Sequence, residues 1–295
     1  MITRENTVAA NGVSFAVLES GPRDGPLALC LHGYPDTAWT WRHLMGELAD
    51  AGWRAVAPFM RGYAPTSLPS DGCYQTGALI ADANGLHEAL GGTDEAALIG
   101  HDWGAVTAYG AAGHQPERWQ RVVTLAIPPA PVMAAAFTNV EQLKRSWYMF
   151  FQCTPLAEQL IPLESFSFLR VLWNDWSPGY DATEDLERVT KALAEPSRLL
   201  AALGYYRAQF GIEDFNPSLA AEQQAAAMTP PQPTLYLHGS TDGCVAAAYA
   251  SSALGFLSQG SEVDVIEDAG HWLHLEKPQE VNRRIVEFVG AGARR

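Results

Sequence analysis

The chain has 295 residues, a length that suits one large α/β domain or a core interrupted by a second unit. Its 33 acidic residues outnumber 19 basic ones, which gives a formal net charge of −14. This excess repels phosphate, so we expect neither nucleic acid nor an anionic membrane surface as a partner. No segment reaches the roughly 18 uncharged apolar residues that cross a bilayer, and the N-terminal segment lacks a signal-peptide pattern. We therefore expect a cytoplasmic protein.

The first part of the chain alternates short apolar runs with stretches of helical spacing. Two early runs, NTVAAN and VSFAVLES, predict an antiparallel hairpin at a sheet edge. The later apolar runs predict buried strands at 26–33, 53–60, 95–102 and 120–127. Helices are predicted between them at 37–52, 75–91 and 104–119. Strand–helix–strand alternation indicates a mostly parallel, twisted sheet with helices on both faces.

The pattern changes after residue 130. Residues 131–229 carry aromatic residues and leucines at helical spacing without a convincing strand. Alternation then returns, with strands predicted at 234–240 and 262–268 and a C-terminal helix at 276–292. We therefore divide the chain into a core (1–130 and 230–295) and an inserted, all-helical cap (131–229). Such a lid would cover the carboxyl ends of the strands, where open parallel sheets place their sites.

One turn between a predicted strand and a helix carries a candidate nucleophile. In LIGHDWGA, Gly100 and Gly104 stand two residues on either side of Asp102. A nucleophile elbow needs small residues there, because larger side chains would collide in the strained turn. An ordinary turn with a helix-capping aspartate would show the same string, so the assignment depends on the rest of the chain.

The segment HGYP supplies a possible oxyanion hole. It follows the strand 26–33 and runs from His32 to Pro35. We expect the backbone N–H groups of Tyr34 and Trp103 to stabilise an oxyanion, because donors in a rigid turn are fixed before reaction. His32, Pro35 and Trp103 are expected to border the substrate pocket. His32 also suits a buried, turn-stabilising histidine, and we assign it no proton transfer.

The acid and base of a catalytic triad are predicted near the C-terminus. Asp242 follows the strand 234–240, and His271 follows the last strand. The order nucleophile, acid, base is the one in which nucleophile-elbow hydrolases present a triad. Asp242 would accept the Nδ1 proton of His271 and fix its tautomer. His274 competes for the role of base, but a packing or surface histidine is its better interpretation.

These motifs, in this order, resemble the epoxide hydrolase family of the α/β-hydrolase superfamily. HGYP resembles that family's HGxP motif, RGYAPTS its RGYGxS segment and GHDWGA its nucleophile segment. The resemblance spans essentially the whole chain and implies an α/β-hydrolase fold. Ala64–Pro65 stands where the family commonly has a single glycine, and we expect only a local loop change there.

The resemblance also implies a mechanism. Asp102 would attack an epoxide carbon to form an alkyl ester, and water activated by His271 and Asp242 would release a vicinal diol. The partners implied are a small apolar epoxide and water. No cofactor is expected. No metal is expected either, because the four cysteines form no CxxC pair.

Two lid tyrosines hydrogen-bond the epoxide oxygen in this family. GYYRAQF resembles the segment of the second and points to Tyr206. RSWYMFFQ resembles the segment of the first and points to Tyr148, although counting back from Gln152 would select Trp147 instead. A slip of one residue rotates a helical side chain by about 100°, so the choice between the two residues stays open.

Three other functions compete with epoxide hydrolysis. Haloalkane dehalogenases share the nucleophile, base and oxyanion hole, and Trp103 would serve their halide site. Tyr34 in the variable position of HGxP and Tyr206 in the lid favour an epoxide. A catalytically inactive binding protein is disfavoured by the complete triad, and a serine esterase by the missing Gly-x-Ser-x-Gly elbow. The sequence carries no signal of the oligomeric state.

Overall fold

The computed structural model describes residues 3–213 and 215–290, and within them eight strands form one sheet. The strand order is β1-β2-β4-β3-β5-β6-β7-β8, with β1, β2 and β4 paired antiparallel and all other neighbours parallel. The strands are β1 (Arg4–Ala10), β2 (Val13–Ser20), β3 (Leu27–Leu31), β4 (Arg54–Pro58), β5 (Ala97–His101), β6 (Arg121–Leu125), β7 (Thr234–Gly239) and β8 (Glu262–Ile266). The mostly parallel sheet and the hairpin at its edge confirm the predicted fold class.

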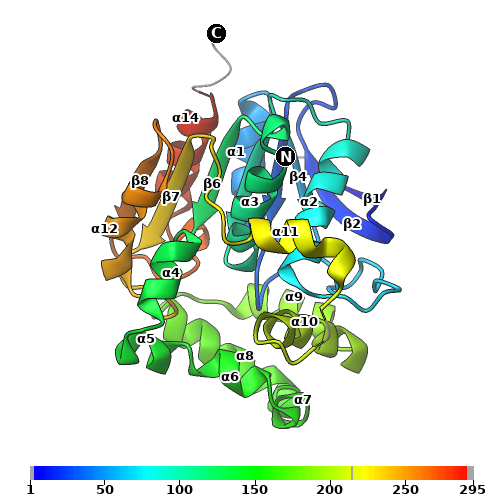
Figure 1. The fold of residues 1–295 in the computed structure, drawn as a ribbon, viewed down its shortest axis with the longest axis vertical. Helices are drawn as coiled ribbons and strands as arrows, with labels where there is room; N and C mark the ends of the chain where they lie inside the picture. The colour runs from blue at the N-terminus through cyan, green and yellow to red at the C-terminus, as the bar shows by residue number, and fades with distance from the viewer. Residues whose placement is uncertain (1–2, 214, 291–295) are drawn as a thin grey trace.

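Helices cover both faces of the sheet, as the alternation predicts (Figure 1). The crossover from β3 to β4 and the crossover from β4 to β5 run in opposite directions along the sheet. Because such connections are right-handed, their helices α1 and α2 lie on opposite faces. Helix α3 packs beside α2, and α14 packs beside α1. The helices of the core are α1 (Leu44–Asp50), α2 (Thr76–Ala89), α3 (Trp103–His114), α12 (Ala250–Ala253), α13 (Leu273–Glu276) and α14 (Pro278–Gly290).

Three predicted core helices differ from the observed ones at their ends. The predicted helix 37–52 is a short 3-10 turn followed by α1, which begins only at Leu44. The predicted helix 104–119 stops at His114, because Pro116 cannot continue it. Near the C-terminus, helix α13 ends at Glu276 and α14 begins at Pro278, because proline is well suited to the first position of a helix. Residues 291 and 292 of that prediction lie outside the described residues.

The segment between β6 and β7 is helical in the described residues. Its helices are α4 (Ala130–Ala136), α5 (Val140–Arg145), α6 (Trp147–Gln152), α7 (Pro155–Leu160), α8 (Leu163–Trp176), α9 (Thr183–Leu193), α10 (Pro196–Gln209) and α11 (Ala220–Ala225). Figure 1 shows α5 to α10 grouped beyond one end of the sheet, whereas α11 returns to pack on α2 and α3. Among the described residues, none of the helices combines the length and apolar character that a membrane span requires.

The turn between β5 and α3 positions Asp102 at the carboxyl edge of the sheet. Asp102 adopts a φ of 52°, a conformation that costs an ordinary L-residue about 1–3 kcal/mol. The flanking glycines make this turn possible. A Cβ on Gly100 would collide with the Gly104 carbonyl, and a Cβ on Gly104 would collide with the carbonyl of Leu31 in β3. The close approach of α3 to β3 therefore explains the spacing of glycines around Asp102.

We predict that Gly104→Ala lowers the free energy of unfolding by about 3 kcal/mol, because its Cβ meets the rigid backbone of β3. The matched control is Gly255→Ala, where a Cβ meets nothing within 4 Å and the backbone is ordinary. Urea denaturation followed by circular dichroism measures both variants. An equal cost at the two positions would contradict the close packing of the turn.

Candidate active site

The carboxylate of Asp102 is buried and held by the loop that follows β3. Its Oδ1 atom accepts a hydrogen bond of 2.8 Å from the backbone N–H of Tyr34. A Cβ on Gly33 would collide with the same carboxylate, so the HGYP loop needs glycine at that position. Trp103 is the first residue of α3, where a backbone N–H has no partner inside the helix. The two predicted oxyanion donors therefore flank Asp102, and one of them is hydrogen-bonded to it.

Asp242 and His271 meet Asp102 at the carboxyl edge of the sheet, where they follow β7, β8 and β5 respectively. His271 Nδ1 lies 2.9 Å from Asp242 Oδ2, and His271 Nε2 lies 3.7 Å from Asp102 Oδ2. The other carboxylate oxygen of Asp242 accepts hydrogen bonds from the backbone N–H groups of Cys244 (2.7 Å) and Val245 (3.0 Å). All three side chains are buried. The structure thus brings together the three residues that the sequence predicts as a triad.

The charges of the two carboxylates decide the protonation of His271. Burial alone lowers the pKa of an imidazole, because it disfavours the cation. Here the charge and hydrogen bond of Asp242, together with the nearby Asp102 carboxylate, outweigh burial and raise the pKa of His271 to about 10. At neutral pH, His271 is therefore an imidazolium between two carboxylates.

A cavity of about 110 Å³ opens beside Asp102. It is mostly apolar, and its polar lining residues include Asp102, Tyr148 and Tyr206. Its lining residues come from the core, the cap helices and the loop after β7: Asp102, Trp103, Val106, Ile127, Met133, Phe137, Ser146, Tyr148, Met149, Tyr206, Gln209, Cys244 and Val245. Such a concave apolar site with a few convergent polar groups has the character of a small-molecule site.

Tyr148 faces this cavity, and Trp147 does not. Trp147 is 45% exposed and packs its ring on Phe151 and Phe168. The Tyr148 ring is buried and lies 5.9 Å from the ring of Tyr206. The rotation of α6 about its axis therefore turns Tyr148 to the cavity. The spacing in the sequence had left the choice between Tyr148 and Trp147 open.

Both cavity tyrosines remain protonated at physiological pH. Burial, with smaller contributions from neighbouring groups that include the Asp102 charge, raises the pKa of Tyr148 and of Tyr206 well above the usual range. The hydroxyl of Tyr206 has no hydrogen-bond partner among residues 3–213 and 215–290. The Tyr148 hydroxyl lies 3.3 Å from the sulfur of Cys244. Two phenolic donors are therefore available at the cavity.

His32 and Pro35 do not line the cavity, which corrects their expected place in the substrate pocket. The Nδ1 atom of His32 bonds the Gly33 carbonyl (2.8 Å), and its Nε2 accepts from the N–H of Met60 (2.9 Å). The ring thereby joins two backbone segments and is a turn-stabilising histidine. The Pro35 carbonyl accepts from the indole of Trp173 (3.0 Å).

Several groups that support the triad have no signal in the sequence. The carbonyl of Trp176, at the end of cap helix α8, accepts from the backbone N–H of His271 (2.9 Å) and of Gly243 (3.1 Å). His271 belongs to the predicted acid–base pair and Gly243 follows its acid, so the end of α8 fixes both loops of the pair. Cys244 also lines the cavity. In the sequence, only its position two residues after Asp242 hints at this.

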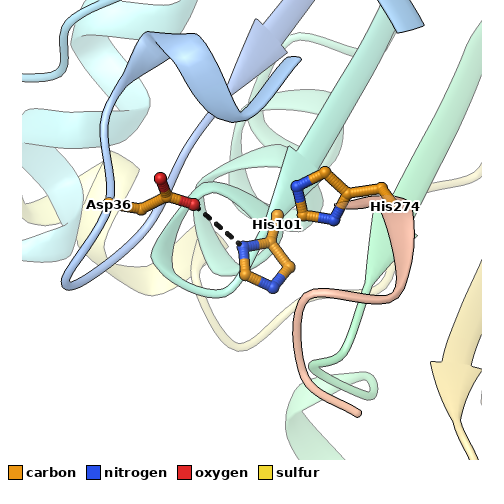
Figure 2. Close-up of side chains that lie close together, drawn as sticks. All are labelled: Asp36, His101 and His274. Carbon is orange, nitrogen blue, oxygen red and sulfur yellow. Dashed lines mark ion pairs between the residues drawn. The ribbon is translucent and has the colours of Figure 1, made fainter. Parts of the chain in front are cut away.

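A second buried cluster lies behind the nucleophile turn: Asp36, His101 and His274 (Figure 2). His101 Nε2 lies 3.0 Å from the His271 carbonyl and must donate, because a carbonyl only accepts. His274 Nε2 lies 2.6 Å from Thr40 Oγ1, so His274 is a packing histidine and not the base at the cavity. Burial, reinforced by the charge of Asp185, raises the pKa of Asp36 to about 7.

The cluster has the residue types of a metal site but a wider spacing. Ligands at 2.0–2.1 Å around a tetrahedral zinc ion lie roughly 3.4 Å from each other. Asp36 Oδ2 and His101 Nδ1 are 4.0 Å apart. Asp242, Cys244 and His271 are also close together, but the hydrogen bonds of the triad occupy them.

Comparison with known proteins places this chain in a family. The sequence profile described as the alpha/beta hydrolase fold matches residues 26–278. An epoxide hydrolase of Caballeronia sordidicola is 33% identical over 97% of this chain and 93% of its own length. Epoxide hydrolase A of Mycobacterium tuberculosis is 28% identical, with 97% of each chain covered. The structure of Bacillus megaterium epoxide hydrolase superimposes with a TM-score of 0.81 at 26% identity, covering 97% of this chain and all of that one.

We predict that Asp102→Asn lowers the pKa of His271 from its value of about 10, because one of the two charges that oppose burial is removed. The pH titration of the His271 ring proton by NMR measures the shift, and the His271→Gln spectrum identifies the signal. Asp268→Asn serves as the control, since Asp268 is an exposed residue of the same loop. A titration unchanged by Asp102→Asn would contradict the charge coupling.

Proposed function

Because this chain belongs to the epoxide hydrolase family of the α/β-hydrolase superfamily, we propose that it opens an epoxide with water to give a vicinal diol. One observation carries the proposal: a single apolar cavity is lined by the carboxylate of Asp102 and by Tyr148 and Tyr206. A carboxylate is suited to displacement at saturated carbon, and phenols are suited to protonating an alkoxide.

The first step is attack by Asp102 on an epoxide carbon. Oδ2 is the nucleophilic atom, because Oδ1 is held by the N–H of Tyr34. The C–O bond of the ring breaks, an ester forms on Asp102, and the departing oxygen takes a proton from Tyr206 or Tyr148. Burial raises the pKa of both phenols, so each still carries the proton that it can donate to the departing oxygen.

Ester formation converts His271 from an imidazolium into a base. Asp102 loses its negative charge when it becomes an ester, so one of the two charges that raise the pKa of His271 disappears. The proton that His271 releases returns the tyrosinate, formed when a tyrosine protonates the alkoxide, to a phenol. Neutral His271 can then take a proton from water, which attacks the carbonyl carbon of the ester.

The second step restores the enzyme. The carbonyl oxygen of the ester is Oδ1, so the developing oxyanion forms where the N–H of Tyr34 already points. The N–H of Trp103 is the proposed second donor. The intermediate collapses by cleavage of the bond between the ester carbon and Oδ2, and the departing alkoxide takes the proton of the newly added hydroxyl. The diol leaves with Oδ2, Asp102 is again a carboxylate, and His271 stays protonated, with Asp242 stabilising the cation.

The first test pairs turnover with a covalent trap. The purified protein is incubated with styrene oxide and, separately, with 1-bromohexane, and diol and bromide are measured. We expect diol from the epoxide. In His271→Gln the ester on Asp102 should persist, because no base activates water, and intact mass should rise by the mass of one epoxide.

Each alternative function gives a different result in this test. Release of bromide without diol would identify the halide reaction, for which Trp103 in the cavity is suited. An adduct mapped to a residue other than Asp102 would refute the proposed nucleophile. The absence of turnover and of any adduct with either reagent would favour a binding protein.

We predict that Tyr206→Phe slows ring opening about 100-fold and ester hydrolysis little, because the proton donor acts only in the first step. Single-turnover reactions stopped with acid, in which ester and diol are both quantified, separate the two rates. Tyr205→Phe is the matched control, because the Tyr205 hydroxyl donates to the Arg61 carbonyl (2.7 Å) and Tyr205 does not line the cavity. Equal slowing of both steps by Tyr206→Phe would contradict the assigned role.

A further inference from the structure

The cavity at Asp102 is too small to hold a whole substrate of ordinary size. Ligand sites usually enclose about 300–1,000 Å³. The cavity provides about 110 Å³, and part of that space faces the carboxylate and the two tyrosines. It can therefore hold the reacting epoxide and its immediate substituents, and the remainder of a larger molecule must lie elsewhere.

A groove of about 510 Å³ continues from this cavity. Cavity and groove share five lining residues: Val106, Ile127, Met133, Phe137 and Gln209. Met133 and Phe137 are one helical turn apart at the end of α4, so they lie side by side on one face. These two side chains therefore stand at the junction between cavity and groove.

The groove runs between α4 and α11, with α3 as its floor. Figure 1 shows these two helices on either side of α3. Its walls carry small apolar side chains, which include Pro131 and Ala134 of α4 and Ala227 after α11. None of the residues that line it is charged. The groove therefore offers a narrow apolar surface that continues outward from the reacting atoms.

The side-chain oxygens of the polar residues that line the groove have partners within the protein. Gln223 Oε1 accepts from the N–H of Gly77 (2.8 Å). The Tyr109 hydroxyl bonds Thr124 (2.7 Å). Thr76 lies 3.4 Å from the side-chain oxygen of Gln209. The groove therefore favours a hydrocarbon chain over a ligand that needs many hydrogen bonds.

A larger groove of about 750 Å³ does not compete for this role. It lies between the β-hairpin and cap helix α9 and carries the charged side chains of Glu5, Arg188 and Lys191. It shares no lining residue with the cavity at Asp102. Continuity with the reacting carboxylate therefore selects the groove between α4 and α11.

We propose that the substrate is an elongated apolar epoxide, with its oxirane in the cavity at Asp102 and its hydrocarbon chain in the groove between α4 and α11. This inference rests on the proposed function and adds the substrate class. The chain leaves the cavity between Met133 and Phe137 and lies against the small side chains of Pro131, Ala134 and Ala227. Burial of its methylenes supplies binding energy remote from the reacting atoms.

Chain length provides the first test. Diol formation is measured for linear terminal epoxides from 1,2-epoxybutane to 1,2-epoxydecane. We expect kcat/KM to rise about twofold to fourfold for each methylene that enters the groove, fourfold corresponding to full burial. A kcat/KM that is flat or falls with chain length would overturn the inference.

A blocked groove provides the second test. In Ala134→Trp an indole occupies the groove, so the ratio of kcat/KM for 1,2-epoxydecane to that for 1,2-epoxybutane should fall at least tenfold. Ala135→Trp is the matched control, because Ala135 is an exposed alanine on the same helix and does not line the groove. A thermal melt of both variants confirms that they fold.

The two variants together separate failure of this inference from failure of the proposed function. Diol from 1,2-epoxybutane in the wild-type protein, with the same chain-length ratio in Ala134→Trp as in Ala135→Trp, would overturn the groove and leave the epoxide hydrolase activity standing. A protein that converts no epoxide of any length and forms no adduct on Asp102 would refute both. A ratio that falls only in Ala134→Trp supports the groove.

Discussion

A buried imidazolium held between two carboxylates is the interaction on which the active site depends. Burial opposes the charge on His271, and the hydrogen bond of 2.9 Å to Asp242 together with the nearby charge of Asp102 overcomes it. Asp242 is itself fixed by two backbone N–H groups of its own loop. In the proposed mechanism, Asp102 helps to keep His271 protonated and loses its own charge when it becomes an ester. The base is thereby activated by the chemistry of the first step.

The triad could be predicted from the sequence because it stands on short, rigid connections. Asp102 and Asp242 follow buried strands and His271 follows the edge strand β8, and the parallel order of β5, β6, β7 and β8 brings the ends of those strands to one edge. All six predicted parallel strands form inside their predicted ranges, because apolar runs bounded by turn residues leave little choice of position. The glycines around Asp102 were informative as well, because a Cβ at Gly104 would collide with the backbone of β3. Local patterns therefore predicted the fold of the core and three residues that the structure brings together at one edge of its sheet.

Features that depend on packing between distant segments could not be predicted in this way. His32 stands in a motif beside the site, yet both of its ring nitrogens serve the backbone, and only the structure reveals those partners. The choice between Tyr148 and Trp147 depended on the phase of a six-residue helix, which spacing alone does not fix. The Trp176 carbonyl that supports the base loop is a backbone atom and has no residue signature. The boundaries of the cap at 131 and 229 stay a prediction, and α11 within that range packs on core helices.

The predicted cap and the core are joined through His271, the proposed base. The Trp176 carbonyl at the end of α8 accepts from the N–H of His271, and the Trp176 side chain packs 5.1 Å from the imidazole. A Cβ on Gly270 would collide with the backbone of Ser177, so the base loop lies flat against the cap. Displacement of α8 would therefore disturb the position of His271 as well as the shape of the cavity. The groove is walled by α4 and α11, and neither His271 nor a residue of α8 is among the residues that line it. Residues in that groove can vary in size without touching the base, so substrate length can change while the chemistry is preserved.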